Sequence, residues 1–150
     1  MSSTGRYFED FAKGDVFTTP GRTVGETEVT QFAQLTGDFN PLHTDSVFAA
    51  ASPFGRRIAH GLLGLSLVSG LVARLGVFEG TAVAALGIEN WRYHAPVFFG
   101  DTVHVVVTIA DTRLTSDGQR GILFRDYELV NQDGVTVQSG RMPIMVRCRS

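Results

Sequence analysis

The stretch IAHGLLGLSLVSGLVARLGV, residues 58–77, decides the fold that the sequence predicts. It is apolar on nearly every face of a helix, and a helix of that kind must be surrounded by protein. The run from Gly61 to Ala73 carries no charge and is too short to cross a bilayer, which takes about 20 residues. Its glycine and serine residues let other backbone approach closely, and Arg74 and Gly76 mark its end. We therefore expect a buried core helix.

Two shorter helices are expected ahead of this stretch. Residues 25–38, GETEVTQFAQLTGD, place apolar side chains at helical spacing, and the helix starts at Thr27 or Glu28. A second, short helix starts at Thr44 or Asp45, both of which are good N-cap residues.

The rest of the chain is typical of β structure. Strands are expected at residues 17–24, 83–93, 101–115, 121–131 and 135–147. The segment 101–115 alternates most clearly, with valine or isoleucine at the odd positions from 103 to 109. Asp117-Gly118 and Asp133-Gly134 are expected to be hairpin turns. A long apolar helix wrapped by a curved antiparallel sheet predicts an α+β architecture. Sheet edges are often protected by association of chains, so we expect a homodimer or a higher oligomer.

Composition narrows the classes of function. The 150 residues have a net charge of −2 and are 43% hydrophobic, which fits one domain over residues 1–150. The sequence lacks the basic patch or stripe that is typical of a nucleic-acid-binding protein. Cys148 is the only cysteine, so an intrachain disulfide is excluded and a reducing compartment fits. The N-terminus lacks the basic-then-apolar pattern of a signal peptide. We expect a cytoplasmic protein with no membrane contact.

Asp38 and His43 are the first candidates for chemistry. They are five residues apart, and Asn40 and Pro41 lie between them. Pro41 removes an amide donor and keeps Asn40 out of the helical region, so we expect both side chains on a shaped loop between helices. A carboxylate beside an imidazole is a competent acid–base pair that can hold one water molecule. The alternative is that Asp38 caps a helix or turn and His43 is an ordinary polar residue.

The start of the long helix is the second candidate. The first amides of a helix have no intrahelical acceptor, and the N–H of Gly61, which has no side chain, can closely approach a ligand oxygen, as an oxyanion hole requires. Alternatively, Gly61 only makes room for a strand. His60 is expected to bond to backbone rather than to act in catalysis. Ser66 and Ser69 are expected to bond to carbonyls of the preceding turn, although one of them could touch a catalytic water or the substrate.

Other chemistries find no support in the sequence. It contains no GxSxG elbow, P-loop or GxGxxG motif. Its four histidines are scattered, without an HExxH or CxxC pattern. We therefore expect no metal and no cofactor.

The candidate segments resemble a known family. GDFNPLHTDSVFA (37–49), followed by FGRRIAHGLLGLSLVSGL (54–71), resembles the signature of MaoC-like (R)-specific enoyl-CoA hydratases. NWRYHAPVFFGDTVHVVV (90–107) is similar to a strand pair of that family. The resemblance implies a hot-dog fold, in which a long helix lies in a curved antiparallel sheet. It also implies a dimer with an acyl-thioester tunnel near the subunit interface.

The resemblance assigns roles to individual residues. Asp38 and His43 match the catalytic dyad, and Gly61 matches the amide donor to the thioester carbonyl. Ser69 matches a serine near the catalytic site, and Asn40 a residue that supports the dyad loop. The implied activity is reversible addition of water to a 2-enoyl thioester of CoA or of an acyl-carrier protein.

Two other functions share the fold. A hot-dog thioesterase usually places a carboxylate on or near the long helix, and residues 58–77 contain no Asp or Glu. A non-catalytic acyl-CoA-binding protein would not need an intact dyad.

Overall fold

The computed structural model describes residues 5–149. Residues 1–4 and 150 lie outside this range. Two expectations extend beyond the described residues. The N-terminal segment without a signal-peptide pattern starts there, and both ends of the domain expected over residues 1–150 lie there.

The chain forms one 3₁₀ helix, four α-helices and eight strands within the described residues. In chain order they are η1 (Phe8–Asp10), β1 (Val16–Thr18), β2 (Arg22–Thr23), α1 (Glu26–Thr36), α2 (Pro41–Thr44), α3 (Ser46–Ala50), α4 (Gly61–Ala73), β3 (Ala82–Ala85), β4 (Glu89–Tyr93), β5 (Thr102–Leu114), β6 (Arg120–Val130), β7 (Thr136–Arg141) and β8 (Ile144–Arg147).

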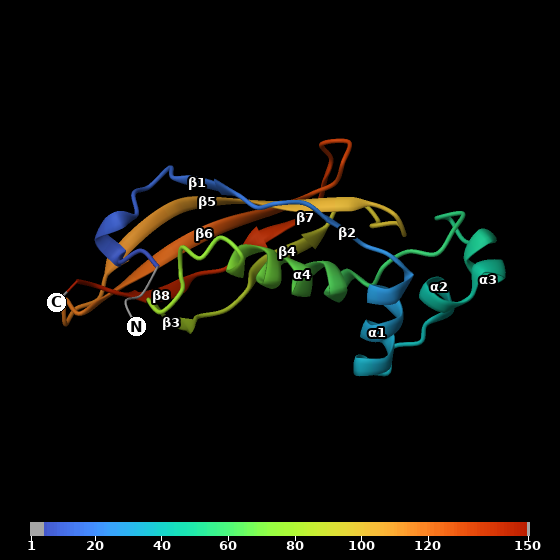
Figure 1. Ribbon diagram of the computed structural model, residues 1–150, viewed down its shortest axis with the longest axis horizontal. Coiled ribbons are helices and arrows are strands. Elements are labelled where there is room, and N and C mark those ends of the chain that lie inside the picture. Colours follow the sequence, from blue (N-terminus) through green and yellow to red (C-terminus); the bar gives the residue numbers. More distant parts are fainter. Residues whose placement is uncertain (1–4, 150) are drawn as a thin grey trace.

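All strands pair antiparallel in one curved sheet. The main strand order is β1-β5-β6-β7-β4, while β2 pairs with β5, and β8 pairs with both β6 and β3. Figure 1 shows α4 lying along one face of this sheet, with α1, α2 and α3 gathered at the end where α4 begins. The α+β architecture with a helix against an antiparallel sheet is confirmed.

The core lies between α4 and the sheet. The odd positions of β5 that the alternation placed on one face, Val103 to Ile109, have no exposed surface. The three valines pack with Val68 and Leu71 of α4 and with Leu129 of β6, whereas Ile109 belongs to a second cluster with Leu123. Gly64 lies directly over the side chain of Gln138 on β7, which would collide with a Cβ at 2.2 Å, so the glycine sets the closest approach of helix and sheet.

Within one chain, α4 is not enclosed on every side. Leu62 is 58% exposed, and Ser66, Ser69 and Gly70 are exposed as well. The expectation of a helix surrounded by protein is therefore wrong for the single chain. The outer face of α4 carries mostly small, uncharged residues, and the strand β3 is exposed along its length. The expected homodimer stays a prediction.

Three expected strands are interrupted. The segment 17–24 divides into β1 and β2 around Pro20, which cannot donate a ladder hydrogen bond. The segment 83–93 divides into β3 and β4, which pair with different strands. The segment 135–147 divides at Met142-Pro143 into β7 and β8, which both pair with β6 but have different second partners, β4 and β3. A sheet that curves around a helix needs these breaks, because proline and glycine positions let the strands change partners.

Most local signals are confirmed. Gly118 and Gly134 adopt positive φ angles of 68° and 75°, as Asp-Gly hairpin turns require. Asp45 caps α3 by accepting hydrogen bonds from Val47 N and Phe48 N at 2.9 Å. One expectation is wrong: His43 lies on the short helix α2, with Pro41 as its first residue, rather than on a loop.

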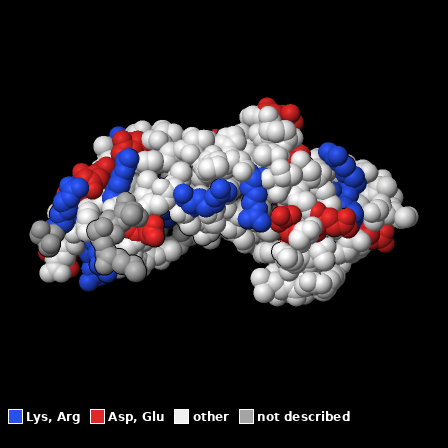
Figure 2. Space-filling view, in the orientation of Figure 1, with Lys and Arg blue, Asp and Glu red and all other residues white. Residues whose placement is uncertain are grey.

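The surface carries charges of both signs. On the face shown in Figure 2, basic side chains stand in several separate groups with acidic ones among them. No helix among residues 5–149 is long and apolar enough to cross a membrane.

Truncating Leu71 tests the packing of α4. Leu71 is 2% exposed, so Leu71→Ala should lower the free energy of unfolding by about 2–5 kcal/mol. The matched control is Leu35→Ala on α1, where the leucine is 83% exposed and the change should stay within about 0.5 kcal/mol. Urea unfolding followed by Trp91 fluorescence measures both. Equal losses in the two variants would contradict the packing described here.

Candidate active site

Asp38 follows directly after α1. Gly37 ends that helix with a positive φ of 77° and donates its N–H to Ala33 O at 2.8 Å. The chain then turns, and Asp38 Oδ1 accepts a hydrogen bond from Asn40 N at 3.2 Å. The turn-capping role considered for Asp38 is therefore real, but it uses one carboxylate oxygen. The other, Oδ2, lies 4.0 Å from His60 Nε2 on an exposed side chain, so it can still reach a water molecule.

Asn40 organises the next turn of chain. As N-cap of α2, its side-chain Oδ1 accepts from Leu42 N at 3.0 Å, and Pro41 occupies the first helical position. This short helix carries His43. By capping this helix, Asn40 supports the segment between Asp38 and His43. Its role in function stays a prediction.

The tautomer of His43 follows from its partner. Its Nδ1 lies 2.7 Å from the backbone carbonyl oxygen of Ile58. A carbonyl can only accept, so Nδ1 carries the proton and Nε2 of the neutral ring has a free lone pair. Burial, and to a smaller extent the neighbouring His60, lower the pKa of His43, and together they outweigh the opposing hydrogen bond to Ile58 and the attraction of Asp38. The neutral ring with an unprotonated Nε2 is thus favoured near neutral pH.

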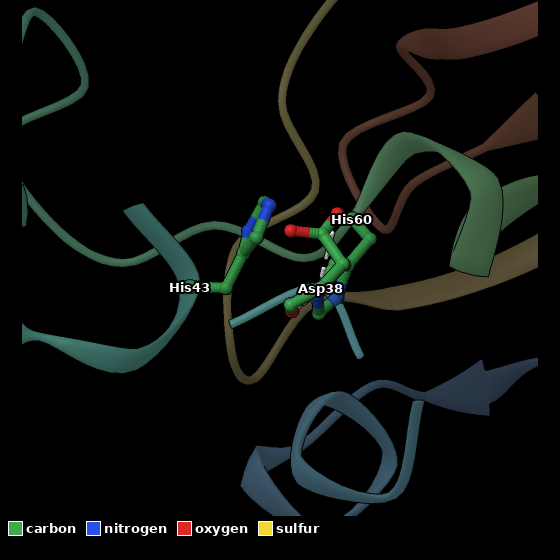
Figure 3. A group of neighbouring side chains, drawn as sticks. All are labelled: Asp38, His43 and His60. Carbon is green, nitrogen blue, oxygen red and sulfur yellow. Dashed lines mark hydrogen bonds and ion pairs between the residues drawn. The ribbon is translucent and has the colours of Figure 1, made fainter. Parts of the chain in front are cut away.

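His60 is buried beneath this pair. It is 3% exposed, and its Nε2 donates to the backbone carbonyl oxygen of Asp38 at 2.9 Å, as expected for a helix-entry histidine. Its ring stacks on that of His43, with centroids 3.8 Å apart and planes tilted by 30°. Figure 3 shows the three side chains together, from the loop after α1, from α2 and from the segment before α4. The sequence did not reveal this stacking, because no local pattern links residues 17 positions apart.

Gly61 is the first residue of α4. Neither its N–H nor that of Leu62 finds an acceptor within the described chain, since the first bonds to His60 O come from Leu63 and Gly64. A Cβ on Gly61 would meet the ring of Tyr93 at 2.7 Å. The packing role considered for Gly61 is therefore present, and so is the unpaired amide at a helix N-terminus. The partial positive charge there favours a negatively charged ligand atom.

One cavity joins these groups. Its volume is about 450 Å³, and Asp38, His43, His60 and Gly61 all line it, together with Tyr93 and mostly apolar neighbours. Gln138 closes its floor: the buried amide donates to Gly61 O at 3.1 Å and accepts from Trp91 Nε1 at 3.1 Å. Gln138 is a positioning residue that the sequence did not reveal, since a buried polar residue in a strand gives no signal in periodicity.

The geometry fits activation of one water molecule. A carboxylate oxygen of Asp38 and a ring nitrogen of His43 lie within 4.8 Å of each other. Two hydrogen bonds of about 2.8 Å to a shared water oxygen span roughly 4.5 Å. His43 Nε2 can take a proton from such a water, while Asp38 Oδ2 orients it.

The same three side chains are also of the types that bind metal ions. Asp38, His43 and His60 each offer one ligand atom, all within 4.8 Å of one another. The lone pairs of an imidazole lie in its ring plane, however, and the two rings are stacked with only a 30° tilt. Their lone pairs do not converge on one point, and the ring nitrogens bonded to Ile58 O and Asp38 O are engaged. These residues fit proton transfer better than metal binding.

Ser66 and Ser69 lie elsewhere. The Ser66 hydroxyl donates to Leu62 O at 2.8 Å, as expected for a serine in a helix. Ser69 is one turn further along α4 and lines a separate cavity, together with residues of β3, β6 and β8. Within one chain, Ser69 is not brought to Asp38 and His43, and its contact with substrate stays a prediction.

The comparisons with known proteins agree on one family. Its model, described as MaoC like domain, matches residues 9–123. The chain is 41% identical over 103 residues to Protein MaoC of Klebsiella aerogenes, covering 69% of this chain and 30% of that protein. It is 31% identical over 147 residues to an (R)-specific enoyl-CoA hydratase of Rhodospirillum rubrum, covering 95% of this chain and 93% of that one. The chain thus spans under a third of Protein MaoC but nearly all of the second relative.

Solved structures support the fold. A monoamine oxidase regulatory protein from Archaeoglobus fulgius superposes with a TM-score of 0.91 and 33% identity, covering 97% of both chains. A Mycobacterium tuberculosis protein with a double hot-dog fold gives a TM-score of 0.86 at 23% identity, over 99% of this chain and 46% of that chain. The second likeness concerns the fold alone. The expected hot-dog fold is confirmed.

The pKa of His43 can be measured directly. Because burial favours the neutral ring, the imidazole should titrate at a lower pH than an ordinary histidine, and Asp38→Asn should lower its pKa further by removing the carboxylate that stabilises the imidazolium. NMR titration of the ring C–H signals measures the pKa. Asp117→Asn, in the hairpin turn at the opposite end of the molecule, is the control and should leave the curve unchanged. A His43 pKa above the ordinary value would contradict the geometry.

Proposed function

The chain belongs to the MaoC-like domain family, and from this premise we propose that it adds water reversibly to a 2-enoyl-CoA thioester to give a 3-hydroxyacyl-CoA. The relative from Rhodospirillum rubrum carries the name of this activity. One observation carries the proposal for this chain. An unprotonated imidazole nitrogen, a carboxylate oxygen and an unpaired helix N-terminal amide line the same cavity.

Water addition begins at the His43–Asp38 pair. A water molecule bound between His43 Nε2 and Asp38 Oδ2 loses a proton to Nε2 while its oxygen forms a bond to C3 of the enoyl group. The hydrogen bond from His43 Nδ1 to Ile58 O holds the ring in the tautomer that this step needs. The adjacent Asp38 carboxylate stabilises the imidazolium that results.

Charge then develops on the thioester carbonyl. The electron pair of the C2=C3 bond moves toward the carbonyl oxygen and forms an enolate, to which Gly61 N–H donates. One well-placed donor of this kind contributes about 3–4 kcal/mol to transition-state stabilisation. The protonated dyad returns one proton to C2, the carbonyl re-forms, and the sum of the steps adds one water molecule.

The depressed pKa of His43 sets the acid limb of the pH profile. The reactive form is the neutral ring, so activity persists as pH falls below the ordinary histidine pKa. It is lost when pH passes the lowered pKa and Nε2 becomes protonated. We also propose that the chain acts as a homodimer. The carrier of the thioester is CoA or an acyl-carrier protein.

Removing either member of the dyad tests the reaction. Asp38→Asn and His43→Gln should each lower kcat for crotonyl-CoA hydration by about 10²–10⁴-fold, because general acid–base help is of that size. Mass spectrometry for the gain of one water measures turnover, with branched and long-chain enoyl-CoAs as further substrates. His104→Ala on β5 is the control and should retain full activity. Activity like that of the wild type in both dyad variants would exclude this mechanism, and release of free CoA from saturated acyl-CoAs would instead indicate a thioesterase.

A methyl group at Gly61 tests the amide. Gly61→Ala puts a Cβ against the Tyr93 ring and beside the amide, so kcat should fall by at least about tenfold. Gly70→Ala, in the same helix, meets nothing within 4 Å and should leave kcat unchanged. Steady-state kinetics of both variants, together with circular dichroism, give the result. A Gly61→Ala enzyme with normal kcat would leave the amide without a role.

A further inference from the structure

Arg125 occupies a core position of the sheet. Leu123, Tyr127 and Leu129 share its face of β6, and all three belong to the hydrophobic core. Arg125 lies between them and is only 6% exposed. A guanidinium stays charged in proteins, and burying a charge is unfavourable unless an opposite charge or complete hydrogen bonding compensates.

The chain satisfies this guanidinium only in part. Its Nε donates to Met142 O at 3.0 Å. The rings of Phe78 and Tyr127 flank it, with their centroids 4.7 and 5.1 Å from Cζ. Within residues 5–149 no carboxylate forms an ion pair with Arg125, and its two Nη nitrogens have no acceptor. One full edge of the guanidinium, with both Nη groups, is therefore without a protein partner.

Arg125 also lines a cavity. Its volume is about 1060 Å³, and residues of α4, β3, β6 and the start of β8 line it. In Figure 1, β3 and β8 lie near the C-terminal end of α4, at the opposite end of the molecule from α1 and α2. Most lining residues are apolar, and Arg125 is the only cation among the described residues that line it. Ser69 and Glu79 line the same cavity, and Glu79 has a partner of its own.

We propose that this cavity binds an organic carboxylate with an apolar chain, whose two oxygens accept from Nη1 and Nη2 of Arg125. A carboxylate matches the planar guanidinium edge in a bidentate arrangement, and a low-dielectric surrounding strengthens the pair. The apolar walls formed by α4 and β3 cover the hydrocarbon part of the ligand. The carboxylate of such a ligand supplies the negative charge that the protein does not place beside Arg125. Binding of the ligand therefore explains why a charged residue is buried at this position.

Two sources of such a carboxylate are distinguishable. One is a free carboxylic acid that binds independently of turnover. The other is the distal carboxylate of a dicarboxylic acyl thioester, an arm that rests on the proposed hydratase function. Binding of a free acid can be measured without catalysis, so failure of the proposed function would leave this measurement intact.

Binding of octanoate to the full-length protein is the first experiment. Isothermal titration calorimetry should show octanoate binding to the wild type, and octan-1-ol, which lacks the charge, should bind at least about tenfold more weakly. Arg125→Met should lose octanoate binding by at least about tenfold, and Arg125→Lys should retain part of it as a charged variant. Arg120→Met, at the exposed start of the same strand, is the matched control and should bind like the wild type.

The outcomes separate clearly. Equal affinity for octanoate and octan-1-ol, or undiminished octanoate binding in Arg125→Met, would overturn the inference. So would a dimer, detected by sedimentation, in which no carboxylate binds because a second copy covers the cavity. If Arg125→Met does not fold, the comparison of the wild type with Arg125→Lys and the two ligands still decides.

Turnover then identifies the source. Hydration of 2-octenoyl-CoA and of its analogue with a terminal carboxylate, 2-octenedioyl-CoA, is compared in the wild type and Arg125→Lys. A KM that rises at least about tenfold for the dicarboxylic substrate alone assigns the site to the acyl chain. Unchanged KM values for both, with weakened octanoate binding, assign it to a free acid. Absence of hydration with octanoate still bound would disprove the proposed function and leave this site standing.

Discussion

The packing of α4 against the sheet is the constraint on which the rest of the structure depends. Val103, Val105 and Val107 are fully buried beneath it, and Gly64 allows the helix backbone to rest on Gln138. This contact fixes the helix axis, and therefore the position of its N-terminal amides. Gln138 strengthens the effect by donating to Gly61 O and accepting from Trp91. The first turn of α4 is thus held by a buried polar bridge at the point where the cavity needs a rigid amide.

The candidate active site is built mainly from backbone acceptors. Carbonyl oxygens of Ile58 and Asp38 select the ring nitrogens that carry protons on His43 and His60. Stacking of the two rings at 3.8 Å then limits their rotation. Asp38 divides its two oxygens between holding a turn and facing the cavity. A reactive pair is therefore positioned by groups whose own chemistry does not change during a proton transfer.

Arg125 departs from the rules that the rest of the core follows. Its neighbours on β6 are apolar and almost fully buried, while it brings a charge into the same layer. Aromatic flanks and one carbonyl satisfy it incompletely. Folding alone favours an apolar residue at this position, because replacing an unpaired buried charge by a hydrophobic side chain is often stabilising. Arg125 is therefore better explained by the proposed ligand binding in the cavity beside α4 than by stability.

The amino-acid sequence by itself determined the local features of this protein. Alternation in residues 103–109, the Asp-Gly turns and the Asp45 cap depend on a few neighbouring residues, so they could be predicted, and the family resemblance assembled them into a hot-dog fold. It also located Asp38, His43 and Gly61, which line one cavity. The tertiary structure alone decided the stacking of His60 on His43, the bridge of Gln138, the unpartnered edge of Arg125 and the placement of Ser69 on a second cavity. These contacts join residues far apart in the chain, and they form only where the buried helix brings the segments together.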